Sequence, residues 1–262
     1  MDNRREPARV VLVAFMLGAS SAYLISYMHP PISGIAHLDI WPILQGYLGA
    51  TLNIAAPEEA LKLLVLIFFC SRYIAYDHPM EGVVYGAAVG LGFAAYENLF
   101  YLASNPEHWK ALALVRGIFT VPVHGALGVI IGTYAVKAKF GTLSGDTRRR
   151  GVRIVSYISG WAIATVLHGL FDFPLLLQPQ LALAQSDKTA WWLGLGLVVA
   201  GFVTFVAARI VYFARRSQTV IHNSFTHGKR FQNHSWRVTG VVGITLFLAG
   251  LPLLGWLREF TQ

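Results

Sequence analysis

The sequence predicts an all-α protein, a polytopic transmembrane helical bundle of about seven spans with its N-terminus in the cytoplasm. Hydrophobic residues make up 55% of the 262 residues and charged residues 13%, about half the charged fraction of a soluble domain. Apolar stretches of about 18 residues or more recur along the whole chain. Lysine and arginine gather in alternate loops. Together these three observations predict one integral membrane domain over residues 1–262.

The predicted spans are apolar segments long enough to cross the hydrocarbon core as helices. They lie near residues 10–28, 40–71, 82–103, 111–137, 153–177, 190–213 and 238–257. The second segment is too long for one straight span and contains Pro57, so we expect a break near Ala56 and Pro57. The count becomes eight if the first half of this segment is a separate interfacial helix.

The loop charges predict the orientation. Basic residues precede the first span, follow the second at Arg72, and fill the loops 137–153 and 215–237, whereas the intervening loops contain few. Because such residues concentrate on the cytoplasmic side, seven crossings place every basic cluster there. The net charge of +8 is therefore explained by topology, and the partners we expect are the lipid bilayer and no nucleic acid.

The first segment begins after a basic N-terminus and has small residues near its end, as a signal peptide does. Its apolar stretch continues through Ile25 and Tyr27, so we expect an uncleaved anchor. The single cysteine, Cys70, excludes an intrachain disulfide and a site built from several cysteines.

Four consecutive spans, the second to the fifth, carry ionisable residues at membrane depth. They are Glu58, Glu59, Lys62, Glu97, Arg116, His124, His168 and Asp172. Such residues face a protein interior or a water-filled cavity and indicate function, so we expect one shared site. At about 1.5 Å per residue, Glu97 and His168 lie roughly 9 and 13 Å from the outer ends of their spans. This depth places the site in the outer half of the membrane.

Helical spacing brings these groups together. Lys62 follows Glu58 by four residues and Glu59 by three, so its ammonium can pair with either carboxylate. Asp172 follows His168 by four residues and shares its helix face. Small residues also recur every fourth position, which predicts close helix packing. They are Gly82, Gly86, Gly90, Ala94 and Asn98 in the third span, and Gly128 and Gly132, after His124, in the fourth.

Structural roles compete with functional ones. A Glu–Lys pair in the second span could only fix packing, and Asp172 could cap a helix end. Arg116, near a helix end, is interpreted as structural, either snorkelling to the interface or pairing with Glu107. Because two histidines and three glutamates occur together, we favour a functional cluster.

Carboxylates and imidazoles without a serine or cysteine nucleophile beside a base predict an activated water. In a metal-assisted version, Glu97, His124 and His168 hold a Zn²⁺ ion with one position open for water. Glu58 or Glu59 then acts as the general base.

A metal-free version uses the same residues. Glu58 activates the water directly, and His168 and Asp172 orient it or stabilise the oxyanion. Lys62 keeps the neighbouring carboxylate ionised in both versions. The residues leave the choice open.

Four ordered motifs between about residues 40 and 175 carry these residues: PEEALK, DHPMEGVVYGAAVGLGFAAYENLFY, RGIFTVPVHGALGVIIG and LHGLFD. They resemble the successive motifs of the PrsW family of intramembrane proteases. This family belongs to a superfamily that includes the CAAX prenyl proteases and the bacteriocin-processing membrane proteases. The resemblance implies functional roles for Glu58, Glu59, Glu97, His124 and His168, and with them Lys62 and Asp172. The wider superfamily has histidine at the position of Glu97, so roles assigned there do not transfer to it.

The resemblance also implies a biological role. It implies cleavage of a membrane-anchored regulatory protein, such as an anti-sigma factor, on the outer side of a bacterial cytoplasmic (inner) membrane. PrsW-like proteins have been described both as metalloproteases and as glutamate proteases. We expect a catalytic core at about 40–177 and scaffold or gating helices at about 190–257.

The main alternative is an ion-coupled transporter or channel that uses the Glu and His cluster as a proton or cation relay. The spans show no paired repeat, and the ionisable residues cluster in four adjacent helices, which favours the peptidase. A third interpretation is a non-catalytic scaffold that binds a partner helix. The oligomeric state is left open.

Overall fold

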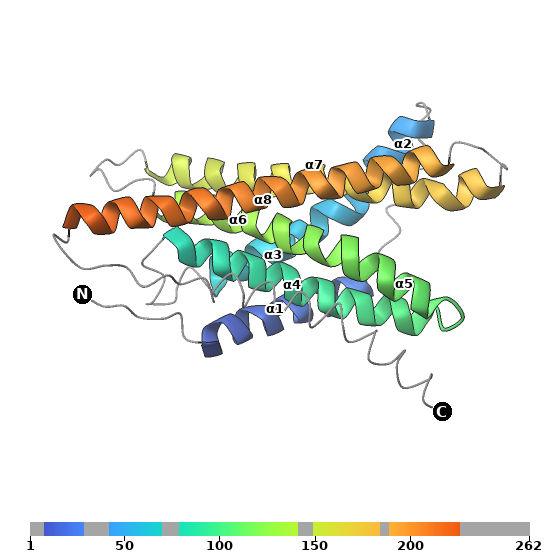
Figure 1. Ribbon diagram of the computed structural model, residues 1–262, viewed down its shortest axis with the longest axis horizontal. Coiled ribbons are helices and arrows are strands. Elements are labelled where there is room, and N and C mark those ends of the chain that lie inside the picture. The colour runs from blue at the N-terminus through green and yellow to red at the C-terminus, as the bar shows by residue number, and fades with distance from the viewer. Residues whose placement is uncertain (1–7, 29–41, 70–78, 141–148, 184–188, 226–262) are drawn as a thin grey trace.

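The computed structural model describes residues 8–28, 42–69, 79–140, 149–183 and 189–225, and its regular elements there are all helical (Figure 1). They are α1 (Ala8–Met28), α2 (Pro42–Leu48), η2 (Gly49–Ala55), α3 (Ala56–Phe68), α4 (Pro79–Ser104), α5 (Trp109–Val115), η4 (Arg116–Thr120), α6 (Val121–Phe140), α7 (Arg149–Leu183) and α8 (Thr189–Phe225). The prediction of an all-α fold is thus confirmed for the described residues.

Five helices in the described part are long and apolar enough to cross a membrane. They cover Ala8–Ser26, Met80–Ser104, Trp109–Ala138, Gly151–Leu176 and Gly194–Ala214, and they confirm a multi-pass membrane protein. The segment 40–71 is not among them; its described part is helical from Pro42 to Phe68, but the α3 portion carries three buried charged side chains. The predicted span at 238–257 lies outside the described residues. The full count, the cytoplasmic N-terminus, the uncleaved anchor and the core boundary stay predictions.

The expected break at Pro57 is a π-helix instead. The helix continues through this point, and the N–H of Ala56 bonds to the carbonyl of Thr51, five residues earlier. A proline has no N–H, and its ring crowds the carbonyl four residues before it. The wider π winding accommodates both effects without ending the helix.

A second π segment has the same relation to a proline. η4 ends at Thr120, and the N–H of Val121 bonds to the carbonyl of Arg116, five residues earlier. Pro122 follows directly. Each π segment therefore leads, through a proline, into a helix that carries buried polar residues within the next two positions.

α4 lies at the centre of the bundle, packed between α1 and α6 (Figure 1). A Cβ on Gly86 would strike the carbonyl oxygen of Gly128 in α6, and a Cβ on Gly92 would strike that of Phe15 in α1. Backbones can approach this closely only where glycine stands. The predicted small-residue contact between the third and fourth spans is confirmed, and α1 makes a second one.

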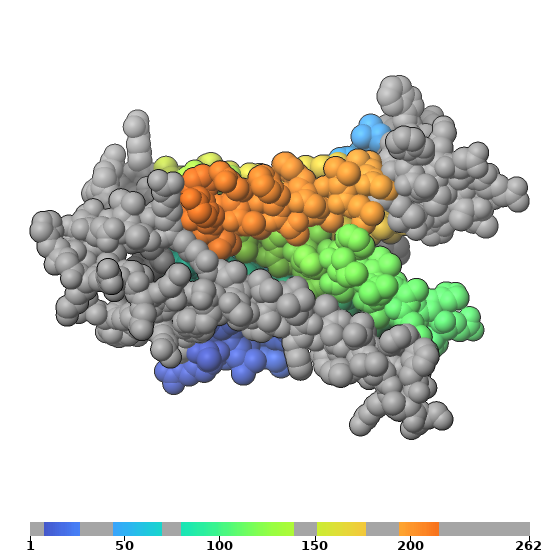
Figure 2. All heavy atoms as spheres, in the orientation of Figure 1, coloured from blue at the N-terminus to red at the C-terminus, as the bar shows by residue number. Residues whose placement is uncertain are grey.

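α7 and α8 run along the opposite side of α6 from α4 (Figure 1). The coloured part of α8 lies along one face of the bundle (Figure 2). Val198, Phe202 and Phe205 are exposed on it. Apolar residues exposed along one helix face are expected where the helix meets lipid.

Candidate active site

The site is organised by the first turns of α3, which follow Pro57. Glu59 and Lys62 have 0% exposure. Lys62 Nζ donates to Glu59 Oε1 at 2.7 Å. Of the two partners that the sequence allowed Lys62, the structure selects Glu59. Because burying an ion pair costs desolvation energy, such a pair needs further partners.

Lys62 and Glu59 each reach one of the two histidines. Lys62 Nζ lies 2.8 Å from Nδ1 of His124 in α6. Glu59 Oε1 lies 2.7 Å from Nδ1 of His168 in α7. The two imidazole rings lie 4.9 Å apart, centre to centre, and nearly perpendicular. The α3 pair therefore fixes both rings through the same nitrogen and leaves both Nε2 atoms facing the opposite way.

Both Nε2 atoms face carboxylates. His124 Nε2 lies 2.8 Å from Glu97 Oε2. His168 Nε2 lies 3.1 Å from Asp172 Oδ2 and 3.9 Å from Glu58 Oε2. The predicted shared face of His168 and Asp172 is thus a direct contact. All seven residues that the sequence singled out as catalytic meet in one cluster, although their individual roles stay predictions.

Sequence reasoning missed the surroundings of Glu97. Arg116 places its NH2 group 3.0 Å from Glu97 Oε2, and its Nε donates to Asn98 Oδ1 at 2.8 Å. Its guanidinium also stacks on the ring of Tyr101 at 3.9 Å. The interpretation of Arg116 as a snorkelling residue or a partner of Glu107 is corrected, because the winding of η4 turns it inward. The adjacent Glu97–Asn98 pair was the available signal for a buried cation.

A group of three ligands could hold a metal ion. Among the described residues, one ligand atom each from Glu58, His124 and His168 lies within 4.8 Å of the others, and all three side chains are buried. Ligands about 2.0–2.1 Å from a tetrahedral zinc ion lie about 3.4 Å apart, so small side-chain rotations would close the set. Glu58 Oε2 is buried without a hydrogen-bond partner. A lone carboxylate oxygen facing two imidazoles is well suited to a cation.

The metal group differs from the set expected from the sequence by one member. It contains Glu58 where the sequence placed Glu97. Glu97 nevertheless borders the same point, since its Oε2 atom contacts His124 Nε2. Its role as a ligand stays a prediction.

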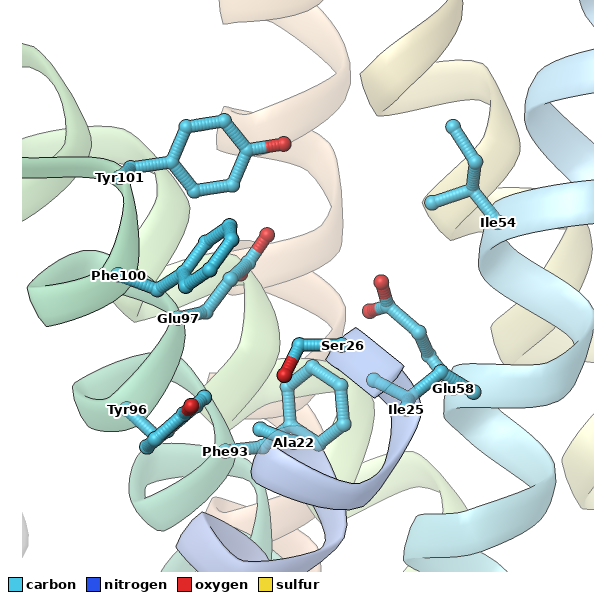
Figure 3. Close-up of a pocket in the computed structure, with 10 residues that line it drawn as sticks. All are labelled: Ala22, Ile25, Ser26, Ile54, Glu58, Phe93, Tyr96, Glu97, Phe100 and Tyr101. Carbon is cyan, nitrogen blue, oxygen red and sulfur yellow. The ribbon is translucent and has the colours of Figure 1, made fainter. Parts of the chain in front are cut away.

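A cavity of about 260 Å³ opens beside the cluster. The side chains of Glu58 and Glu97 face it from α3 and α4, and the last described turns of α1 close it from a third side (Figure 3). The candidate catalytic residues therefore lie next to a cavity that can hold part of a substrate.

Apolar helices that could cross a membrane surround a buried Glu–His cluster with a cavity at its edge, an arrangement that fits a membrane-embedded hydrolytic enzyme. The chain belongs to the PrsW family. The sequence model of this family, described as "PrsW family intramembrane metalloprotease", matches residues 6–208. The resemblance read from the four motifs is confirmed, and the chain is an intramembrane protease. Membership favours this activity over the transporter and scaffold alternatives.

Curated relatives agree with this assignment. Protease PrsW of Geobacillus kaustophilus is 30% identical over 192 residues, 72% of this chain and 78% of the relative. Protease PrsW of Bacillus subtilis is 32% identical over 175 residues, 65% and 71% respectively. Protease PrsW of Oceanobacillus iheyensis is 29% identical over 174 residues, 66% and 74%. No solved structure matches the chain.

Proposed function

We propose that the chain hydrolyses a peptide bond of a membrane-anchored protein with a water molecule activated between Glu58, His124 and His168. One observation carries this proposal. The orphaned, buried oxygen of Glu58 lies beside two anchored imidazoles, at the edge of a cavity that a substrate can enter. Buried carboxylate oxygens usually have a hydrogen-bond partner, so an unpartnered one beside two imidazoles supports a bound cation or water at this point.

Glu58, His124 and His168 would hold a Zn²⁺ ion. When bound, the ion acidifies its water and polarises the scissile carbonyl. The Nδ1 contacts of Glu59 and Lys62 orient the two rings, as outer partners of metal ligands do. An ammonium only donates hydrogen bonds, so a neutral His124 ring that accepts from Lys62 at Nδ1 would carry its proton on Nε2, which lies 2.8 Å from Glu97 Oε2. Ligation through Nε2 would require that proton to pass to water when the ion binds, with Nδ1 taking a proton from Lys62 so that the ring stays neutral.

Glu97 is the proposed general base. It faces the cavity, and its Oε2 atom is fixed by His124 and Arg116. Its carboxylate takes a proton from the attacking water and returns it to the nitrogen of the leaving amine. Asp172 Oδ2 contacts His168 Nε2, the nitrogen that would face the ion, so it would hold the ring in the metal-free state and move aside when the ion binds.

The family resemblance extends this proposal to a regulatory substrate such as an anti-sigma factor, cleaved on the outer side of a bacterial cytoplasmic membrane. The curated relatives are bacterial proteins, which supports this location. The depth of Glu97 and His168 within their spans supports entry of water from the outer side.

The test uses the full chain in proteoliposomes with a single-span substrate. Glu58→Gln, Glu97→Gln and His168→Ala should each lower the rate by at least about 100-fold. Glu107→Gln changes an exposed carboxylate and should leave the rate unchanged. Full activity in all three site variants would refute the proposed site.

Metal content tests the zinc assignment separately. Purified protein should contain about one zinc ion per chain, and His168→Ala should lose it. Cleavage that proceeds without bound metal, and that chelators leave unchanged, would refute the zinc assignment and leave the peptidase.

A further inference from the structure

The cavity beside the cluster has a wall that the catalytic proposal does not use. Ala22 and Ile25 of α1 form this wall, and Phe93 of α4 stands against it (Figure 3). These three residues pack together as a small apolar cluster, and all three are buried. The cavity is therefore a shaped space with a fixed apolar side.

The position of α1 relative to α4 is fixed by close backbone packing. A Cβ on Gly18 would strike the carbonyl oxygen of Val89, and a Cβ on Gly92 would strike that of Phe15. α1 and α4 are thus in backbone contact at the two glycines that precede the cavity. Because Ala22 lies one turn beyond Gly18, its side chain sets how far the cavity extends toward α1.

Phe93 connects this space to the reacting groups. Its ring lies 4.2 Å below Lys62 Nζ and 5.5 Å from the His124 ring, centre to centre. Glu58 and Glu97 border the same cavity. A group that fills the cavity therefore lies next to the bond that these residues would attack.

The lining favours an apolar occupant. Ile25, Ile54 and Phe93 are apolar, and the Ser26 hydroxyl already donates to the carbonyl of Tyr23 at 2.7 Å. An apolar cavity of about 150 Å³ accepts a benzene ring, so 260 Å³ accommodates one large aliphatic or aromatic side chain. The carboxylates at the cavity edge repel an acidic one.

We infer that this cavity is the subsite for a bulky apolar side chain adjacent to the scissile bond, and that Ala22 sets its size. The inference rests on the proposed peptidase function and adds a substrate class to it. The subsite selects leucine, methionine or phenylalanine over alanine, and excludes aspartate at that position.

The experiment compares substrates that differ only at the residue next to the mapped scissile bond, with alanine, leucine, phenylalanine, lysine or aspartate there. The unmodified chain should cleave the leucine and phenylalanine substrates at least about 10-fold more efficiently, in kcat/KM, than the alanine substrate. Ala22→Leu should remove that preference by filling the cavity. Equal cleavage of all five, or a preference for lysine, would overturn the subsite.

Ile25→Ala enlarges the cavity. It is a second test that remains informative if Ala22→Leu does not fold. It should raise the ratio of phenylalanine to leucine cleavage, whereas Leu24→Ala, an equivalent truncation of an exposed neighbour, should not. If Ile25→Ala and the unmodified chain cleave the five substrates with the same relative efficiencies, the subsite inference is overturned. Cleavage by both would still support the peptidase function. Failure of the metal-loaded, unmodified chain to cleave any substrate would overturn both.

Discussion

Replacing Lys62 by methionine tests whether the α3 pair holds the site together. Methionine keeps the length and the apolar stem but removes the ammonium. The change leaves the buried Glu59 carboxylate with His168 as its remaining partner and removes the donor to His124 Nδ1. Breaking a buried ion pair from one side costs about 3–5 kcal/mol. We expect a loss of that size in the free energy of unfolding.

The assay is reversible unfolding of the purified chain in mixed micelles, read as a double-mutant cycle. Glu59→Gln removes the second charge, so Lys62→Met in that background should cost less than Lys62→Met alone. The difference is the coupling energy, expected at about 1–3 kcal/mol. Lys137→Met removes an exposed ammonium and should change stability by less than about 0.5 kcal/mol. A loss below 1 kcal/mol for Lys62→Met, or no coupling, would refute the reasoning.

Three further outcomes are expected. Gly86→Ala places a Cβ against the Gly128 carbonyl and should cost about 1–3 kcal/mol, measured by unfolding, whereas Gly201→Ala meets open space and should not destabilise. Arg116→Met should lower kcat about 10–100-fold, because it releases Glu97. Arg116→Lys should recover only part of the lost kcat, because lysine lacks the planar fork that contacts Glu97 and Asn98 together. Removing metal with a chelator should abolish cleavage, and added zinc should restore it in the unmodified chain but not in His168→Ala.

The contacts that the sequence predicted correctly are those fixed by spacing along one helix or by runs of small residues. The Lys62–Glu59 and His168–Asp172 contacts are three and four residues apart on one helix, where the backbone alone decides which side chains meet. The α4–α6 contact was also predictable, because a strip of glycine permits a backbone approach that other residues forbid. Span positions in the described part followed from length and hydropathy.

Contacts between helices depend on how each helix is rotated about its axis, and two π segments alter that rotation here. A regular helix extrapolated from His124 back to Arg116 would use a turn of 3.6 residues, but η4 is wound more widely. The Arg116–Glu97 pair therefore could not be read from spacing, and neither could the position of Glu58 beside both histidines. In both places a proline stands two residues after the last residue of the π segment and just before the polar residues, at Pro57 and Pro122. Because a proline disturbs the regular helix at a fixed offset, these two prolines mark where helical extrapolation fails, and they precede the residues that α3 and α6 contribute to the site.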